Sequence, residues 1–242
     1  MKINSTQLAG IALAAGMTLT GGCQTARMAV PPQLDQGADV LPCAGRQGFK
    51  LSENFSFGDY RVEKVKRGWT RRFMWSAIAY ESVSARHTFE FDLLTPAGVL
   101  WHGQAATGVK KGDLKGMVAG GELTIGLTHN MNFVVNLAPG DATNAWTLAM
   151  SEGSRAMLMK GAYSGGRQKF SIEASRQLAG THIPLMDNAG FIVYDGKTPV
   201  AAVELINAGT VRFARELPPD RRDALAAAAA ALLLYRDISG SD

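Results

Sequence analysis

Side chains capable of acid–base or nucleophilic chemistry are few in this chain and follow no catalytic spacing. Four carboxylates are candidates for an acid–base pair: Glu81, Glu90, Asp92 and Glu173. We interpret them as members of the solvent face of strands, the usual place of such residues. His102 follows Trp101 in a predicted strand, and we expect a packed or surface role for it. In the stretch Gly161–Gly165 the serine stands one position too late for a nucleophile elbow, which favours a hairpin turn.

The sequence also lacks the motifs that bind common cofactors and metals. It has no Gly-x-x-x-x-Gly-Lys-Ser/Thr loop, no Gly-x-Gly-x-x-Gly, no His-Glu-x-x-His and no Cys-x-x-Cys. Its four histidines are scattered without the spacing of metal ligands. We therefore assign no catalytic residue, metal or cofactor, and this pattern favours a binding protein over an enzyme without deciding between them.

One stretch concentrates positive charge and interleaves it with aromatic residues. Its basic members are Arg61, Lys64, Lys66, Arg67, Arg71 and Arg72. Such a run suits a membrane surface of anionic lipid or a protein partner. The alternative is a solvated strand face whose aromatic side chains turn inward, and both interpretations stay open. The formal net charge of +4 is too small to indicate nucleic acid, so we expect no nucleic-acid partner.

The N-terminus has the composition of a secretory signal peptide. A positively charged start and a mostly apolar stretch from Leu8 to Leu19 are followed by small residues and then Cys23. This order predicts that residues 1–22 are a signal peptide that is removed on export. With two cysteines in the chain, a disulfide framework is excluded.

The segment Thr20–Cys23 resembles the lipobox of bacterial lipoproteins, with Leu19 one position earlier than the leucine of that motif. The resemblance implies that Cys23 receives a diacylglyceryl group on its sulfur and becomes the acylated first residue of the mature chain. By the sorting rule of that family, Gln24 in place of aspartate implies the outer membrane, facing the periplasm. In the alternative, Cys23 pairs with Cys43 and the protein is soluble in the periplasm.

The region after Cys23 predicts a tether rather than a folded element. From Thr25 to Gly45 the chain is rich in Pro, Gln, Ala and Gly and shows no periodicity. We therefore divide the chain into a signal peptide at 1–22, a lipidated cysteine with a flexible tether at 23–48, and a single domain at 49–242.

Short apolar runs separated by turn residues fill most of that domain. The clearest hairpins join His87–Leu94 to Val99–Ala105 and Gly190–Tyr194 to Pro199–Leu205. Further runs are Phe73–Tyr80, Leu123–Leu127, Asn132–Leu137, Ala145–Met150, Ala156–Tyr163, Lys169–Ala174 and Thr210–Arg215. Strands at this regular spacing indicate an antiparallel sandwich or barrel.

The C-terminal segment 219–237 predicts a helix that is apolar on all sides. Ala and Leu, the strongest helix formers, fill the run Ala224–Leu234 without a charged residue. That run reaches only about 17 Å, too short for a bilayer, so protein must enclose it. A sheet that closes around the helix would bury it and also remove open sheet edges.

The hairpin, strand and apolar helix of Gly190–Asp237 resemble the C-terminal end of tubby-like barrels, the group that contains tubby domains, phospholipid scramblases and LURP-one-related proteins. The resemblance implies a mainly β fold: an antiparallel closed or nearly closed barrel of about twelve strands around a buried C-terminal helix. The phosphoinositide-binding basic pairs of tubby domains and the calcium-binding segments of scramblases have no counterpart here. The resemblance therefore implies the fold and no activity.

Together these features predict a lipid-anchored lipoprotein of the cell envelope that acts as a binding or scaffolding module. Its partners would be the membrane, through the anchor, and an envelope protein or anionic lipid. The alternative is an envelope enzyme, a hydrolase or lipid-modifying protein, whose site the fold assembles from distant residues. A pocket with buried carboxylates or histidines would favour the enzyme, and a shallow basic or aromatic patch would favour binding.

Overall fold

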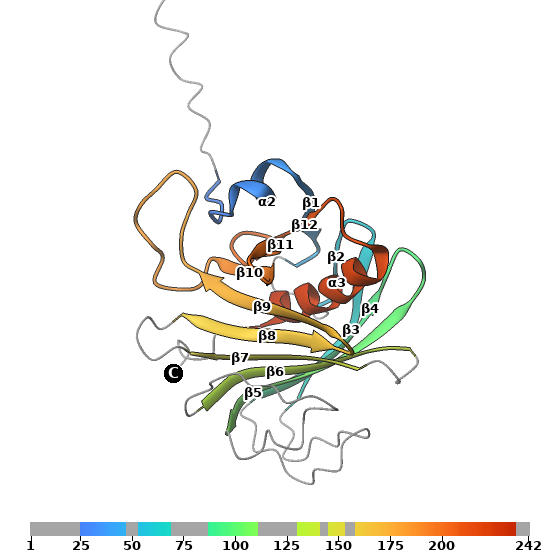
Figure 1. The fold of residues 1–242 in the computed structure, drawn as a ribbon. Coiled ribbons are helices and arrows are strands. Elements are labelled where there is room, and N and C mark those ends of the chain that lie inside the picture. The colour runs from blue at the N-terminus through green and yellow to red at the C-terminus, as the bar shows by residue number, and fades with distance from the viewer. Residues whose placement is uncertain are drawn as a thin grey trace, which may run out of the picture.

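The computed structural model describes residues 25–46, 53–68, 87–110, 130–140, 145–152 and 158–235. Within these residues twelve antiparallel strands form one sheet that closes into a barrel, and the long helix α3 lies inside it (Figure 1). This confirms the predicted mainly β fold class. The expected runs Phe73–Tyr80 and Leu123–Leu127 lie outside the described residues.

Each strand pairs with its neighbours along the chain, and β12 pairs with β1 to close the barrel. The strands are β1 (Ala38–Ala44), β2 (Phe55–Phe57), β3 (Tyr60–Gly68), β4 (His87–Leu94), β5 (Leu100–Lys110), β6 (Asn130–Pro139), β7 (Trp146–Glu152), β8 (Met159–Gly165), β9 (Gln168–Ser175), β10 (Gly190–Asp195), β11 (Thr198–Glu204) and β12 (Thr210–Ala214). The closing register runs from Ala38 opposite Ala214 to Pro42 opposite Thr210.

Both predicted hairpins are confirmed, as the pairs β4–β5 and β10–β11. The stretch Gly161–Gly165, predicted to be a turn, belongs to strand β8, and the turn follows at Gly166 and Arg167. Gly166 has a positive φ of 56°, which glycine adopts without strain, so the reversal falls on that residue.

Helix α3 runs from Pro219 to Leu234 and is buried along the eleven residues from Ala224 to Leu234. Pro219 fits the first turn, where its missing N–H would have no helical partner. The predicted end at Asp237 is too late, because Tyr235 already has an extended conformation. The ring of Tyr235 packs 4.7 Å from that of Phe133 on β6, which fixes the chain as it leaves the helix.

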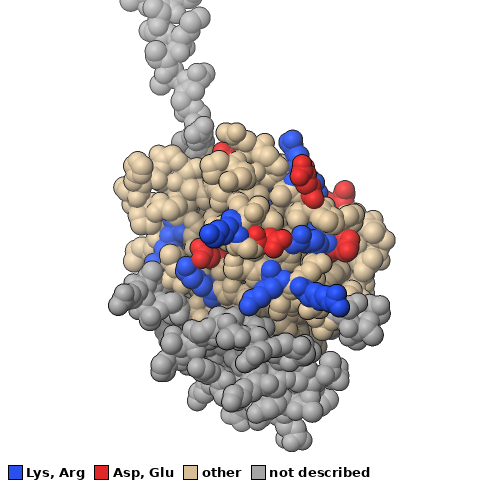
Figure 2. Space-filling view, viewed as in Figure 1, with Lys and Arg blue, Asp and Glu red and all other residues tan. Residues whose placement is uncertain are grey.

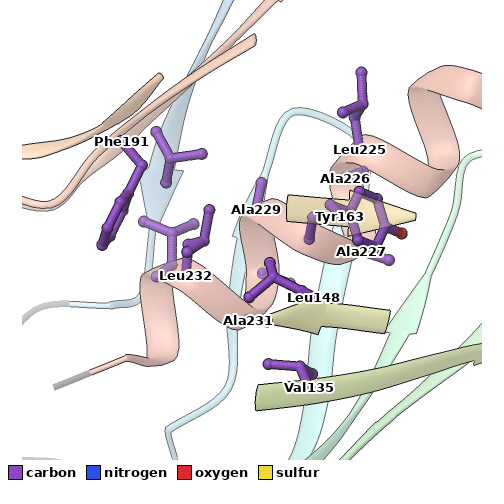
Figure 3. Close-up of a cluster of buried hydrophobic side chains, with 14 of the residues drawn as sticks. Val135, Leu148, Tyr163, Phe191, Leu225, Ala226, Ala227, Ala229, Ala231 and Leu232 are labelled. Atoms are coloured by element: carbon purple, nitrogen blue, oxygen red, sulfur yellow. The ribbon is translucent and has the colours of Figure 1, made fainter. Parts of the chain in front are cut away.

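The interior of the barrel consists of α3 and the inward side chains of the strands around it. Figure 3 shows Val135, Leu148 and Tyr163 from three successive strands facing the alanines of the helix. Alanine methyl groups keep the helix narrow, so aromatic and branched side chains of the wall reach it directly. The hydroxyl of Tyr163 donates a 2.8 Å hydrogen bond to the carbonyl oxygen of Ala224, which satisfies its buried polar atom.

The predicted flexible tether is wrong for residues 25–46. Residues Pro32–Gln36 form the short helix α2, and β1 is a full member of the barrel that begins at Ala38. Met28 and Leu34 are buried against Ala189 and Ala202 on the outside of the barrel. These apolar residues are too widely spaced to produce a helical or strand period, which explains why the sequence alone suggested a tether.

Candidate functional site

The basic run falls on strand β3 and its outer surface is only partly basic. Arg61, Lys64, Lys66 and Arg67 are exposed, whereas Tyr60 and Val62 are buried, as expected if the alternate side chains turn inward. Arg71 and Arg72, the other two basic candidates, lie outside the described residues, as does the lipidation candidate Cys23.

Acidic side chains pair with most of the described basic run. Lys64 contacts Asp92 at 2.8 Å and Lys66 contacts Glu90 at 3.1 Å, both across the β3–β4 pairing. Arg67 contacts Glu53 at 2.6 Å. The described part of this surface is therefore a network of alternating charges, which argues against a continuous positive patch there.

A β-bulge decides which of these side chains reach the outer surface. Glu63 pairs with Asp92 and Lys66 with Glu90, so β3 carries one extra residue between the two pairs. Lys64, at the bulge, has a left-handed φ of 53°, a conformation that costs a non-glycine residue about 1 kcal/mol or more. In a regular strand Lys64 would point inward with Tyr60 and Val62, so the bulge keeps its ammonium group outside.

The β4–β5 register and the bulge together group three residues that no sequence motif links: Lys64, Asp92 and His102. The two carboxylate oxygens of Asp92 accept from Lys64 Nζ at 2.8 Å and contact His102 Nδ1 at 2.9 Å. Burial raises the pKa of Asp92, but the hydrogen bonds from Lys64 and His102 outweigh it, and the pKa lies below its usual value. The hydrogen bond to Asp92 in turn raises the pKa of Lys64.

This cluster orients one imidazole at the surface. His102 is half-exposed, and Asp92 occupies its Nδ1, which leaves Nε2 as the ring atom available to a ligand or proton. The four carboxylates considered for an acid–base pair do not converge within the described residues: Glu90 pairs with Lys66 of β3, whereas Glu173 pairs with Lys160 of β8 at 2.8 Å. Glu81 lies outside the described residues.

After the bulge the alternation of β3 is reversed, and Arg67 points to the end of the barrel. Its guanidinium donates to the carbonyl oxygen of Leu234 at 3.1 Å and lies 5.3 Å from the centre of the Phe89 ring. Arg46 donates to the carbonyl oxygen of Leu233 at 3.2 Å. Two arginines thus satisfy carbonyl groups at the negative end of α3, so Arg67 stabilises the end of the helix.

Arginines also hold the opposite end of the helix. Arg221 pairs with Asp195 at the end of β10, and Arg222 donates to Asp39 of β1 at 2.7 Å. The guanidinium of Arg222 lies 5.3 Å from the centre of the Phe213 ring. The position of α3 is therefore fixed at both ends by contacts with strands far away in the sequence.

A second group of contacts, not foreseen from the sequence, attaches the N-terminal segment to the barrel. The backbone N–H of Met28 donates to Glu204 at 3.1 Å, and Asn207 donates to the carbonyl oxygen of Ala26 at 2.8 Å. Burial raises the pKa of Glu204, an effect that the bond from Met28 and the nearby Arg212 partly offset. The sequence signal that could have revealed this contact is Glu204, a single carboxylate within the apolar run Pro199–Leu205.

The structure places Cys43 in the interior cluster of the barrel, where it is 7% exposed. Burial raises the pKa of its thiol to about 11. Across the described ranges, no group of three His, Cys, Asp or Glu side chains is arranged to hold a metal ion. None of the helices described is long and apolar enough to cross a membrane.

These observations define the chain as an antiparallel barrel in which sequential strands are neighbours and the C-terminal helix fills the interior. Comparison with known proteins adds no narrower class: no family model, curated protein or solved structure matches this chain.

Proposed function

We propose that this protein is a lipid-anchored lipoprotein of the bacterial cell envelope that acts as a binding or scaffolding module. The observation that carries the proposal is the attachment of residues 26–29 to the outside of the barrel, directly after the candidate cysteine. Three residues reach about 10 Å at most, so lipid on Cys23 would hold the folded barrel against the bilayer. A barrel held in that way presents a fixed face to the membrane and its remaining surface to partners.

The position of Cys43 supports lipidation over a disulfide. Its thiol is buried in the core and its raised pKa keeps it protonated at neutral pH, so it is a poor partner in thiol chemistry. A bond to Cys23 would require Cys43 to leave the core, or the N-terminus to enter it. In the proposal Cys23 carries the anchor, Gln24 directs the protein to the outer membrane, and Cys43 stays a free core residue.

The filled interior supports a function carried by the outer surface. Helix α3 and the aromatic wall occupy the centre of the barrel, which is the space a carried ligand would need. The barrel around a C-terminal helix is also the feature on which we base the proposed resemblance to tubby-like barrels. We infer that an envelope protein or a lipid headgroup is the partner of that outer surface.

The intact mass of the membrane-fractionated native protein tests the anchor. We expect a chain that begins at Cys23 and carries three acyl chains, and we expect Cys23→Ser to lose both the acyl mass and the membrane fraction. Cys43→Ser is the matched control, and it should keep both. An unmodified mature chain, or a Cys23→Ser variant that keeps its acyl mass, would refute the proposal.

A further inference from the structure

The loop between β9 and β10 presents two large apolar side chains to solvent. Ile183 is 76% exposed and Met186 is 91% exposed. The other exposed large apolar side chains of the described residues reach only 41–46%: Val40, Val99 and Leu100. Single exposed apolar residues are common, so the exposure alone does not identify a site.

The position of this loop provides the second observation. The N–H of Ala29 donates to the carbonyl oxygen of Gln177 and the N–H of Ala179 donates to that of Arg27, both at 2.9 Å. Figure 1 shows the loop, in orange, projecting beside the first described residues of the chain. The loop and the segment that follows Cys23 are therefore one structural unit.

The apolar tip is held outward by its own contacts. The N–H of Leu185 donates to the carbonyl oxygen of Arg176 at 2.8 Å, and the N–H of Ile183 donates to the hydroxyl of Thr181 at 3.1 Å. Leu178 and Leu185 pack against the outer cluster around Met28. These two leucines turn toward the barrel. They therefore cannot cover Ile183 and Met186, which stay exposed.

The charge distribution agrees with a surface that meets lipid. In Figure 2 the charged side chains gather in a band over β8 and β9 and at the upper right, whereas the upper left part of this face is mainly uncharged. Arg27 is exposed at the base of the loop, where a positive charge suits anionic headgroups. Asp187 follows Met186 and is exposed, which limits insertion to the interfacial zone.

We propose that Ile183 and Met186 insert into the interfacial zone of the bilayer and give the protein a second membrane contact. This inference rests on the proposed lipid anchor, because the lipid at Cys23 holds the loop at the bilayer, where the weak affinity of the loop for lipid takes effect. Cys23 precedes Ala26, the first attached residue, by three positions, so the anchor and the loop lie on the same side of the molecule. The three acyl chains at Cys23 would already hold the protein on the bilayer, and the loop would then fix which face of the barrel meets the lipid.

A fluorescent label tests the insertion in the full-length acylated protein. Ile183→Cys is labelled with a polarity-sensitive nitrobenzoxadiazole dye, because Cys43 is buried and the sulfur of Cys23 carries lipid. The protein is then reconstituted into vesicles of phosphatidylethanolamine and phosphatidylglycerol. We expect a shift of the emission to shorter wavelength and a several-fold decrease in quenching by iodide.

Lys197→Cys, in the β10–β11 turn at the other end of β10, is the matched control and should show neither change. If acylated protein floats with the vesicles while the Ile183 label is quenched like the control, the inference fails and the lipid anchor stands. If the protein carries no acyl chains and stays in solution, both fail. A shift that appears without vesicles and grows with protein concentration identifies a second copy as the occupant and overturns the inference.

A double variant, Ile183→Ser with Met186→Ser, provides an independent measurement. In the Cys23→Ser chain, which has no anchor, these substitutions should reduce residual binding to the same vesicles at least about tenfold. The melting temperature should not change, because both side chains are exposed. Equal vesicle binding with and without the substitutions would contradict the inference.

Discussion

Glu204 is a carboxyl group that the fold buries at the attachment of its N-terminal segment. Its side chain is 5% exposed and accepts a hydrogen bond from the backbone of Met28. Burial raises its pKa above the usual 4.5, and the bond from Met28 and the charge of Arg212 offset only part of that effect. A carboxyl group whose pKa is raised in the folded state makes its full contribution to stability below pH 4.5. That contribution is lost as the pH rises through the pKa of the folded state.

We therefore expect Glu204→Gln to gain stability relative to the wild type as the pH rises. Glutamine still accepts from Met28 but carries no charge to desolvate. The free energy of unfolding, measured by urea denaturation between about pH 4.5 and pH 7.5, should decline more steeply in the wild type than in the variant. A difference between the two proteins that is the same throughout this range would show that Glu204 is not desolvated.

Asp92→Asn provides the control of opposite sign. Hydrogen bonds from Lys64 and His102 lower the pKa of Asp92 below 3.8, so its contribution to stability is complete above that value and is lost at lower pH. Asp92→Asn should therefore lower the free energy of unfolding by a nearly constant amount over the same pH range, whereas the effect of Glu204→Gln changes with pH.

At the level of residues, the sequence predicted burial more successfully than partners. The burial of Tyr60 and Val62 agrees with the alternative interpretation of the basic run, in which apolar side chains turn inward between charged ones. The bulge at Lys64 has no sequence signature. In the part of β3 that follows it, the inward and outward positions of the side chains are exchanged. For that reason the contact of Arg67 with the end of α3 was not foreseen. The pairing of Asp92 with His102 depends on a strand register that no local pattern reveals.

Among the elements, α3 was the most predictable because its composition alone determines both its conformation and its burial. Strands β4, β5, β10 and β11 were also predicted, since tight turns separate runs of alternating or apolar residues. By contrast β1 was missed. Its burial alternates only weakly, because Val40 is half-exposed on the outside and Pro42 interrupts the pattern of apolar residues.

The enclosure of α3 leads to a prediction about a single charge. Ala228 is 1% exposed at the middle of the helix, so Ala228→Asp would bury an unpaired carboxylate at a cost of several kcal/mol. We expect this variant not to fold, as measured by loss of the cooperative thermal transition and rapid proteolysis.

Ala97→Asp, in the exposed β4–β5 turn, introduces the same charge and should change the stability by no more than about 0.5 kcal/mol. A soluble Ala228→Asp protein that melts cooperatively would show that α3 is not enclosed.

At the scale of the whole molecule, the barrel closes through its most distant strands. Residues 38–42 pair with residues 210–214, and α3 is the next element after them. This one pairing of distant strands is expected to form in milliseconds to seconds or more slowly, because a long loop must close before its contacts form. We infer that closure of the barrel and entry of the helix are coupled, since a closed barrel without α3 would have no filled core.

Pulse-labelling hydrogen exchange during refolding checks this coupling. We expect the amides of β1 and α3 to become protected in the same kinetic phase, within milliseconds to seconds. The local hairpin β10–β11 serves as an internal reference, because its amides can become protected before the barrel closes. Protection of β1 well before α3 would mean that an empty barrel forms first, and would contradict the inferred coupling.

The pairing of β1 with β12 has a consequence for the newborn chain. At the usual rate of about 5–20 residues per second, synthesis of 242 residues takes roughly 12 to 50 s. Throughout that time one edge of β1 has no partner, and the aromatic wall has no helix against which to pack. The closed barrel can therefore form only after residues 210–234, which supply β12 and α3, have been synthesised.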